Sequence, residues 1–214
     1  RAMEVPPSPF PMSRAAAPAL GYLRYLRGGP GRALELREVR GARREDIKDV
    51  GHKYYLELEL EDVLDNARAV PCTAEVLYPL GSPASAPDVQ VTLQGQLQST
   101  EGADNEFYSR TRSLEQELEA QNIPDSHGRV PPELEPLLRL GAAAAGFVIW
   151  QNSRENTHLN LAQIKHLKQV KRPDEFLQFD YVLLLHEMVS QEILPWEVTV
   201  LWHPGDSVQV LQDT

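Results

Sequence analysis

The order of predicted elements repeats along the chain: a helix followed by four strands occurs twice in 214 residues. In each copy the helix carries one apolar face, and the strands alternate apolar with polar residues. Such elements bury a core only when the helix packs on the sheet. The sequence therefore predicts an α+β fold with two tandem units, each a helix on a four-stranded antiparallel sheet. A shared stretch, 75–79 in the first copy and 199–204 in the second, favours duplication.

The first unit is predicted to cover residues 1–98. Four prolines exclude regular structure over 4–12, and Ser13 is a residue type common at helix N-caps, so the helix is expected to run from there to the turn at Gly28. Strands are predicted around 34–37, 52–61, 70–76 and 89–93. The clearest is 52–61, which alternates with a period of two.

Residues 99–128 are predicted to connect the units, and 129–214 to form the second one. Within the connection, 105–121 is predicted as a mostly polar helix, a type that often bridges domains. A helix from Pro131 to Asn152 is apolar nearly all round and should be deeply buried. Strands are predicted over 159–171, 176–189, 195–203 and 207–211. Helical spacing of apolar residues makes the first of these ambiguous, and the repeated element order favours a strand.

Composition narrows the functional classes. The formal net charge of −10 argues against nucleic-acid binding and against adsorption to anionic membranes. Cys72 is the only cysteine, which excludes an intrachain disulfide and favours a reducing, cytoplasmic compartment. No apolar stretch approaches the roughly 20 residues of a membrane-spanning helix. We expect a chain that is monomeric when free.

Motifs for catalysis or metal binding are missing from the sequence. The pair His186-Glu187 resembles the start of a zinc-protease motif, but the position that needs a second histidine holds Ser190. Cys72 falls in the apolar set of a strand, as expected of a buried structural thiol. No phosphate-binding or nucleophile-elbow motif occurs. The sequence predicts a binding protein rather than an enzyme, without a cofactor or metal of its own.

One loop stands out as a contact surface. Residues 189–195 combine a polar tip with Ile193 and Leu194, and Pro195 presets the backbone at its end. A preorganised tip suits insertion into a cleft because little ordering remains to be done on binding. An ordinary hairpin turn is the alternative reading of the same residues.

Several segments also carry a resemblance to a known family. They are 13–17, 51–54, 72–79, 118–125, 149–153, 190–193 and 200–204. With these segments, spread in order through the chain, the sequence resembles the latexin family of protein inhibitors of zinc-dependent metallocarboxypeptidases. Tazarotene-induced and eggshell relatives are similar but match less closely. The resemblance implies two cystatin-like subdomains joined by a helix.

The resemblance also implies an activity and a site. The activity would be reversible inhibition of A/B-type metallocarboxypeptidases, with the zinc belonging to the enzyme. A hairpin of the second subdomain would cover the active-site funnel through Ser190, Gln191, Glu192 and Ile193, with Gln191 nearest the zinc. The connecting residues implied to join the contact surface are Gln121, Asn122 and Ile123.

Two alternatives stay open at this point. A family member can lack the inhibitory activity and act as a scaffold or signalling partner. A cystatin-like fold could instead inhibit cysteine proteases, but that activity uses a Gln-x-Val-x-Gly hairpin, and the nearest text, 90–94, has the wrong spacing.

Overall fold

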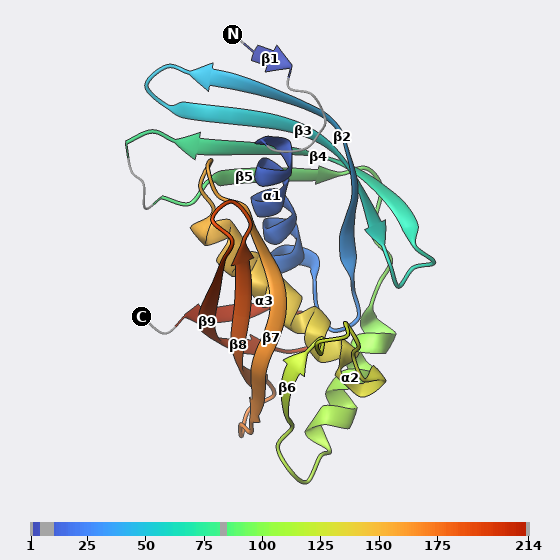
Figure 1. The fold of residues 1–214 in the computed structure, drawn as a ribbon. Coiled ribbons are helices and arrows are strands. Elements are labelled where there is room, and N and C mark those ends of the chain that lie inside the picture. The colour runs from blue at the N-terminus through green and yellow to red at the C-terminus, as the bar shows by residue number, and fades with distance from the viewer. Residues whose placement is uncertain (1, 5–10, 82–84, 213–214) are drawn as a thin grey trace.

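The computed structural model describes residues 2–4, 11–81 and 85–212, and it confirms an α+β fold with two tandem units (Figure 1). The first unit contains β1 (Ala2–Glu4), α1 (Pro11–Arg27), β2 (Leu34–Ile47), β3 (Gly51–Asp62), β4 (Arg68–Pro79) and β5 (Asp88–Leu93). Next come α2 (Glu101–Arg112), β6 (Glu119–Ile123) and a short 3-10 turn (Pro132–Leu134). The second unit continues with α3 (Glu135–Asn152), β7 (Leu159–Val170), β8 (Leu177–Glu187), β9 (Glu192–Trp202) and β10 (Gln209–Gln212).

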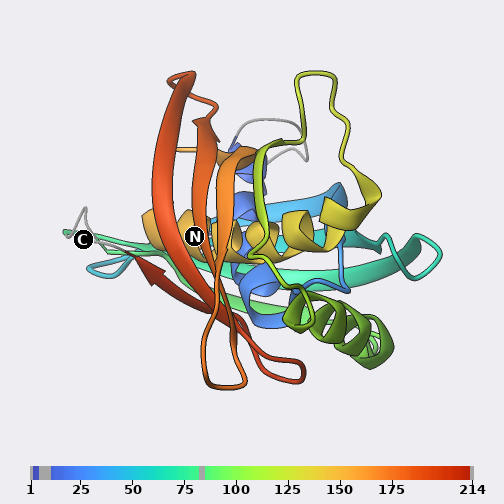
Figure 2. The same cartoon turned by 90° about the horizontal axis from the view of Figure 1, so that it is seen from below.

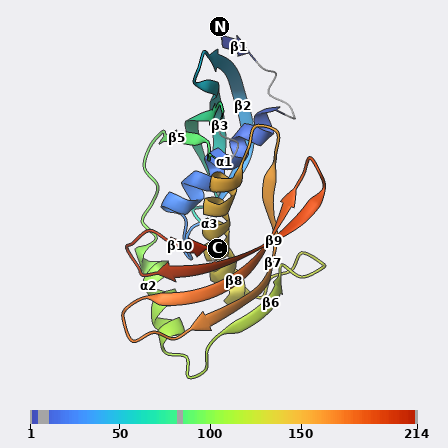
Figure 3. The same cartoon turned by 90° about the vertical axis from the view of Figure 1, so that its left-hand side faces the viewer.

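Each unit is an antiparallel meander. Among the described residues the strand orders are β1-β2-β3-β4-β5 and β10-β9-β8-β7-β6, so each sheet has one edge strand more than predicted. In both units the additional strand precedes the helix and pairs with the strand that follows the helix. Figures 1 and 3 show the layers in the order first sheet, α1, α3 and second sheet. The two helices therefore form the boundary between the units.

Several predicted boundaries were wrong, and the strand expected around 34–37 extends to Ile47. The first helix begins at Pro11 rather than Ser13, because proline is well suited to a helix's first turn, where its missing N–H leaves no bond unmade. Glu4, expected in irregular chain, ends β1, and residues 5–10 lie outside the described part. The predicted helix over 105–121 runs instead from Glu101 to Arg112.

The end of that predicted helix, residues 119–121, belongs instead to β6. This strand pairs antiparallel with β7, and its last residue, Ile123, is 1% exposed in the core of the second unit. The amide of Leu118 donates to Gln169 Oε1 at 3.1 Å, and the amide of Gln169 donates to the Leu118 carbonyl at 2.7 Å. Burial of Ile123 and these bonds override the helix preference of the glutamates and leucines. The predicted domain limits stay predictions, with β6 inside the predicted connection but part of the second sheet.

The ambiguous segment 159–171 is a strand, as the element order predicted. β7 has register irregularities between Leu161 and Gln163 and between Ile164 and His166. A β-bulge inserts one residue, so inward positions follow at a spacing of three instead of two, which resembles a helix in sequence. The buried side chains of Ile164 and Leu167 show that spacing.

The same irregularities occur in the first unit, which supports duplication. β2 shifts register between Leu36 and Glu38 and between Val39 and Gly41. Each counterpart in β7 has the number of the β2 residue plus 125. The turns between β3 and β4 and between β8 and β9 match by the same offset, with positive φ angles at Asn66 (51°) and Gln191 (63°).

α1 and α3 cross where two glycines meet. A Cβ placed on Gly21 would lie 2.7 Å from the carbonyl oxygen of Gly146, and one on Gly146 would collide with the carbonyl oxygen of Gly21. These positions also differ by 125, so equivalent points of the two helices touch. The predicted deep burial of the second helix is confirmed, since its buried residues include Leu137, Leu140 and Val148.

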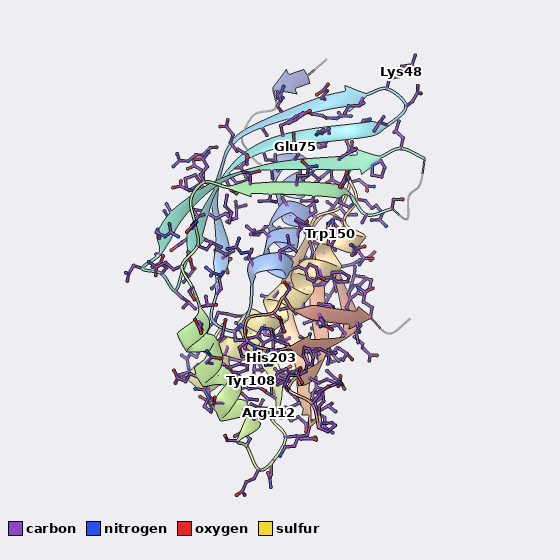
Figure 4. The ribbon with its side chains drawn as sticks, turned by 180° about the vertical axis from the view of Figure 1, so that it is seen from behind. Lys48, Glu75, Tyr108, Arg112, Trp150 and His203 are labelled. Carbon is purple, nitrogen blue, oxygen red and sulfur yellow. The ribbon has the colours of Figure 1, made fainter. Side chains whose placement is uncertain are left out.

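Aromatic and polar contacts surround this crossing. Tyr22 and Trp150 pack edge to face with centroids 4.8 Å apart, and the Trp150 indole N–H donates to the Pro87 carbonyl at 3.0 Å. Figure 4 labels Trp150 at the level where the units meet. The Tyr54 hydroxyl donates to Glu155 at 2.9 Å. Burial, followed by the hydrogen bond to the Glu155 carboxylate, raises the pKa of Tyr54 to about 12. The hydroxyl therefore stays protonated and can donate this hydrogen bond between the units.

α2 bridges the two units, as its polar surface predicted. Phe107 is buried beside Trp202, and Arg112 Nη1 donates to the Asp174 carbonyl at 2.7 Å. Figure 4 shows Tyr108, Arg112 and His203 gathered where α2 meets the second unit. Toward the first unit, Asp104 accepts a bond from the amide of Gly31 at 3.0 Å. The helix is therefore fixed to both sides.

The glycine crossing predicts a stability effect. Gly146→Ala should lower the free energy of unfolding by about 1–3 kcal/mol, because the new methyl group meets a backbone carbonyl that cannot rotate away. Urea unfolding followed by circular dichroism measures this change. The control is Gly102→Ala in α2, where nothing lies within 4 Å, which should raise stability by about 0.5–1 kcal/mol. Equal effects of the two substitutions would contradict the tight crossing.

Candidate functional site

The turn between β8 and β9 forms the candidate site. β8 ends at Glu187, β9 begins at Glu192, and the two residues face each other in the ladder. Gln191 has a φ of 63°, the left-handed conformation that lets the chain reverse. Figures 2 and 3 show the hairpin projecting to one side of the second sheet.

Glu187 holds the turn in shape. Its carboxylate accepts hydrogen bonds from the backbone amides of His158 (2.8 Å), Val189 (3.1 Å) and Ser190 (2.7 Å), and the residue is 8% exposed. Burial acts to raise the pKa of Glu187. The bonds from the His158 amide, from the Ser190 hydroxyl and amide and from the Val189 amide outweigh burial, so the pKa falls to about 2. At neutral pH the turn is therefore built around a charged acceptor.

Sequence reasoning missed this role of Glu187. In the sequence, Glu187 stands out only beside His186, in an incomplete zinc-protease motif. The alternation in β8 places Leu183 and Leu185 inward, and 187 is the next inward position. A carboxylate at an inward position needs hydrogen-bond donors, and the free amides of a following turn supply them. A glutamate at an inward strand position directly before a turn is therefore the sequence pattern that could have predicted this role.

Gln191 folds back over the turn. Its Nε2 donates to the Met188 carbonyl at 2.6 Å, and its Oε1 lies 3.2 Å from Nε2 of His186. The residue remains exposed to solvent. Its side chain therefore stiffens the tip while one face of the amide stays accessible.

The outer surface of the hairpin is exposed and partly apolar. Ser190, Gln191 and Glu192 are exposed, and Ile193 is 52% exposed. Met188 and Val189, at 40% and 48%, extend the apolar area but were not among the predicted contact residues. We call residues 188–193 the hairpin tip. Large apolar side chains on a rigid projection are typical of a surface that becomes buried on binding.

Only part of the second predicted contact segment, residues 121–123, is available at the surface. Gln121 and Asn122 are exposed in β6, whereas Ile123 lies in the core and offers no contact surface. The chain then turns at Asp125, whose Oδ1 accepts from the amides of His127 and Arg129, both at 2.9 Å. Figures 2 and 3 show this loop projecting to the same side as the hairpin tip. The structure therefore places the loop that follows Gln121 and Asn122 on the same side as the hairpin tip.

Cys72 and the metal-ligating side chains are the other groups that could carry chemistry. Cys72 is 2% exposed, and burial raises the pKa of its thiol to about 11, which confirms a structural thiol rather than a nucleophile. Over the described ranges, no cluster of three or more His, Cys, Asp or Glu side chains could hold a metal ion. None of the helices in those ranges is both long and apolar enough to cross a bilayer.

Comparison with known proteins identifies the family. The latexin family model matches residues 5–214. Human latexin is 46% identical over 209 residues, which cover 97% of this chain and 94% of that protein. Mouse latexin is 43% identical with the same coverage. Chicken ovocalyxin-32 is 31% identical over 92% of this chain and 71% of its own length. This chain, with its paired units and projecting hairpin, belongs to the latexin family.

Proposed function

We propose that the protein inhibits zinc-dependent metallocarboxypeptidases of the A/B type by placing the hairpin tip in the mouth of the active site. The observation that carries this proposal is the tip itself: an exposed, partly apolar projection whose backbone is fixed by the Glu187 carboxylate. The class of enzyme comes from the family resemblance. The zinc would be the enzyme's own, and the chain needs no cofactor.

The rigidity of the tip supports inhibition by obstruction. A flexible loop loses conformational entropy on binding. In this tip much of that loss has already occurred, because the amides of Val189 and Ser190 donate to Glu187, Gln191 donates to the Met188 carbonyl, and the His158 amide anchors Glu187 itself. The loop at Asp125 projects to the same side and could contact the rim of a funnel. Together they suit an interface of standard size, about 1,200–2,000 Å².

Side-chain chemistry assigns roles within the tip. Ile193 presents an apolar side chain that would lose contact with water in a cleft, as central interface residues do. Gln191 carries an amide oxygen that could approach a metal or a hydrogen-bond donor of the enzyme. Neither role requires a chemical step by this chain, in keeping with a binding protein.

The first test of this proposal is substitution at the tip. Ile193→Ala and Gln191→Ala should each raise the inhibition constant against carboxypeptidases A and B by about tenfold or more, because central contacts of an interface are typically worth over 1 kcal/mol. The matched control is Leu211→Ala, which removes a similarly exposed side chain (53%) from β10.

The outcomes separate the alternatives. Unchanged constants for both tip variants would remove the hairpin from the mechanism. A wild-type protein that leaves both enzymes uninhibited at micromolar concentration would favour the scaffold role. Inhibition of papain but of neither carboxypeptidase would favour the cystatin-type activity.

A second prediction concerns Glu187 and pH. Its folded pKa lies below the ordinary value, so its stabilising contribution is complete above about pH 4.5 and is lost as the pH falls toward 2. Glu187→Gln should lower the free energy of unfolding by roughly 2 kcal/mol at pH 7, and the difference from wild type should vanish near pH 2. Denaturant unfolding at several pH values measures this, with Glu192→Gln as the exposed control. A difference that is constant from pH 7 to pH 2 would contradict the assignment.

A further inference from the structure

A separate pocket lies between the two units. It has a volume of about 330 Å³ and is lined by the end of α1, the start of β2, the β3–β4 turn and the first turns of α3. Its apolar lining includes Val130, Leu138, Ala142 and Ala143. Val63 and Leu64, which are 40% and 51% exposed, come from the β3–β4 turn and also line it. The size is at the lower end of the range for small-molecule sites.

Three guanidinium groups, those of Arg24, Arg32 and Arg139, and two carboxylates, those of Glu35 and Glu135, line this pocket, which leaves one positive charge in excess. Arg24 already uses two of its nitrogens within the protein, because its Nε donates to the Leu34 carbonyl at 2.9 Å and its Nη2 to Glu35 at 2.8 Å. Burial lowers the pKa of all three groups. An arginine nevertheless keeps its proton at neutral pH, so the lining stays positively charged.

Arg32 and Arg139 have donors to spare. Arg32 is 8% exposed, forms an ion pair with Asp62 at 3.2 Å and donates Nη2 to the Gln98 carbonyl, but its Nε has no hydrogen-bond partner among the described residues. Arg139 donates Nε to the Pro30 carbonyl at 2.6 Å, and its Nη1 is 3.9 Å from Glu135, beyond hydrogen-bond distance. A buried donor without a partner is costly, and an anionic oxygen would relieve that cost.

These observations define one ligand chemistry. The unused guanidinium donors would bind a small anionic group of a ligand, and the apolar walls would pack against a hydrocarbon part of the same ligand. The volume is too small for a large polar ligand. We propose that the pocket between the units binds a small amphipathic carboxylate, with its head group at Arg139 and Arg32 and its apolar body against α3 and the β3–β4 turn. The net charge of −10 would repel anions elsewhere on the surface, so this binding would be site-specific.

The test uses decanoate below its micelle concentration and isothermal titration calorimetry on the whole chain. Decanoate should bind with one site per chain, and decyltrimethylammonium, which has the same tail and the opposite charge, should not bind. Arg139→Gln should weaken binding by about tenfold or more, because it removes a charged donor. Leu64→Glu, at an exposed lining position, should weaken binding to a similar degree by repelling the carboxylate.

Matched controls make the test specific. Arg110→Gln removes an exposed arginine of α2, and Leu80→Glu adds the same charge at another exposed leucine (54%). Both should bind decanoate as the wild type does. If Arg139→Gln impairs folding, as its thermal transition would reveal, Leu64→Glu decides the outcome alone. The proposal is overturned by absence of decanoate binding up to millimolar concentration, by equal binding of the cation, or by wild-type affinity in Leu64→Glu. Carboxypeptidase inhibition plays no part in these outcomes.

Discussion

The backbones of α1 and α3 touch where Gly21 meets Gly146, and the placement of every other element depends on this contact. Each helix is the inner layer of its own unit, so the distance between the helices fixes the distance between the sheets. Side chains at either glycine would separate the layers and pull apart the contacts around Trp150 and Glu155. The pocket lined by Arg139 owes its dimensions to the same crossing, since α1 and α3 both form its walls.

The hairpin tip depends on a different kind of constraint. Its strands belong to the core of the second unit through Leu183 and Leu185, which are fully buried. The turn beyond them has no hydrophobic support and is ordered by the charge of Glu187. A rigid sheet thus carries a rigid projection, but the stability of the sheet comes from burial and that of the projection from hydrogen bonds.

Much of the fold could be predicted because most strands follow a period of two. β3, β8 and β9 were found from alternation alone, and the burial of Tyr54, Leu56 and Leu58 confirms the face assigned. β6 was missed because its residues favour a helix locally, while the bonds that make it a strand come from residues about 50 positions away. Bulges obscured β7, and only the repeated element order recovered it.

The candidate site was predictable to a smaller degree. A proline after a polar turn indicated the hairpin, and exposure of Ile193 agrees with a contact surface. The inward position of Ile123 was not evident because β6 itself was not recognised. The pocket between the units was out of reach for sequence reasoning, because Arg24 and Arg139 meet only through the crossing of two helices that are distant in the chain.

The way Glu187 holds its turn has a consequence for how such a protein could evolve. Because the carboxylate accepts hydrogen bonds from main-chain N–H groups, which every residue except proline possesses, the backbone path of the turn does not depend on the side chain at Val189. If the hairpin tip binds a protease as proposed, substitutions at Val189 would change the contact surface while the turn keeps its backbone path. The stability of the turn depends on Glu187, whereas the proposed recognition depends on exposed side chains. Selection could therefore change recognition without lowering the stability of the turn.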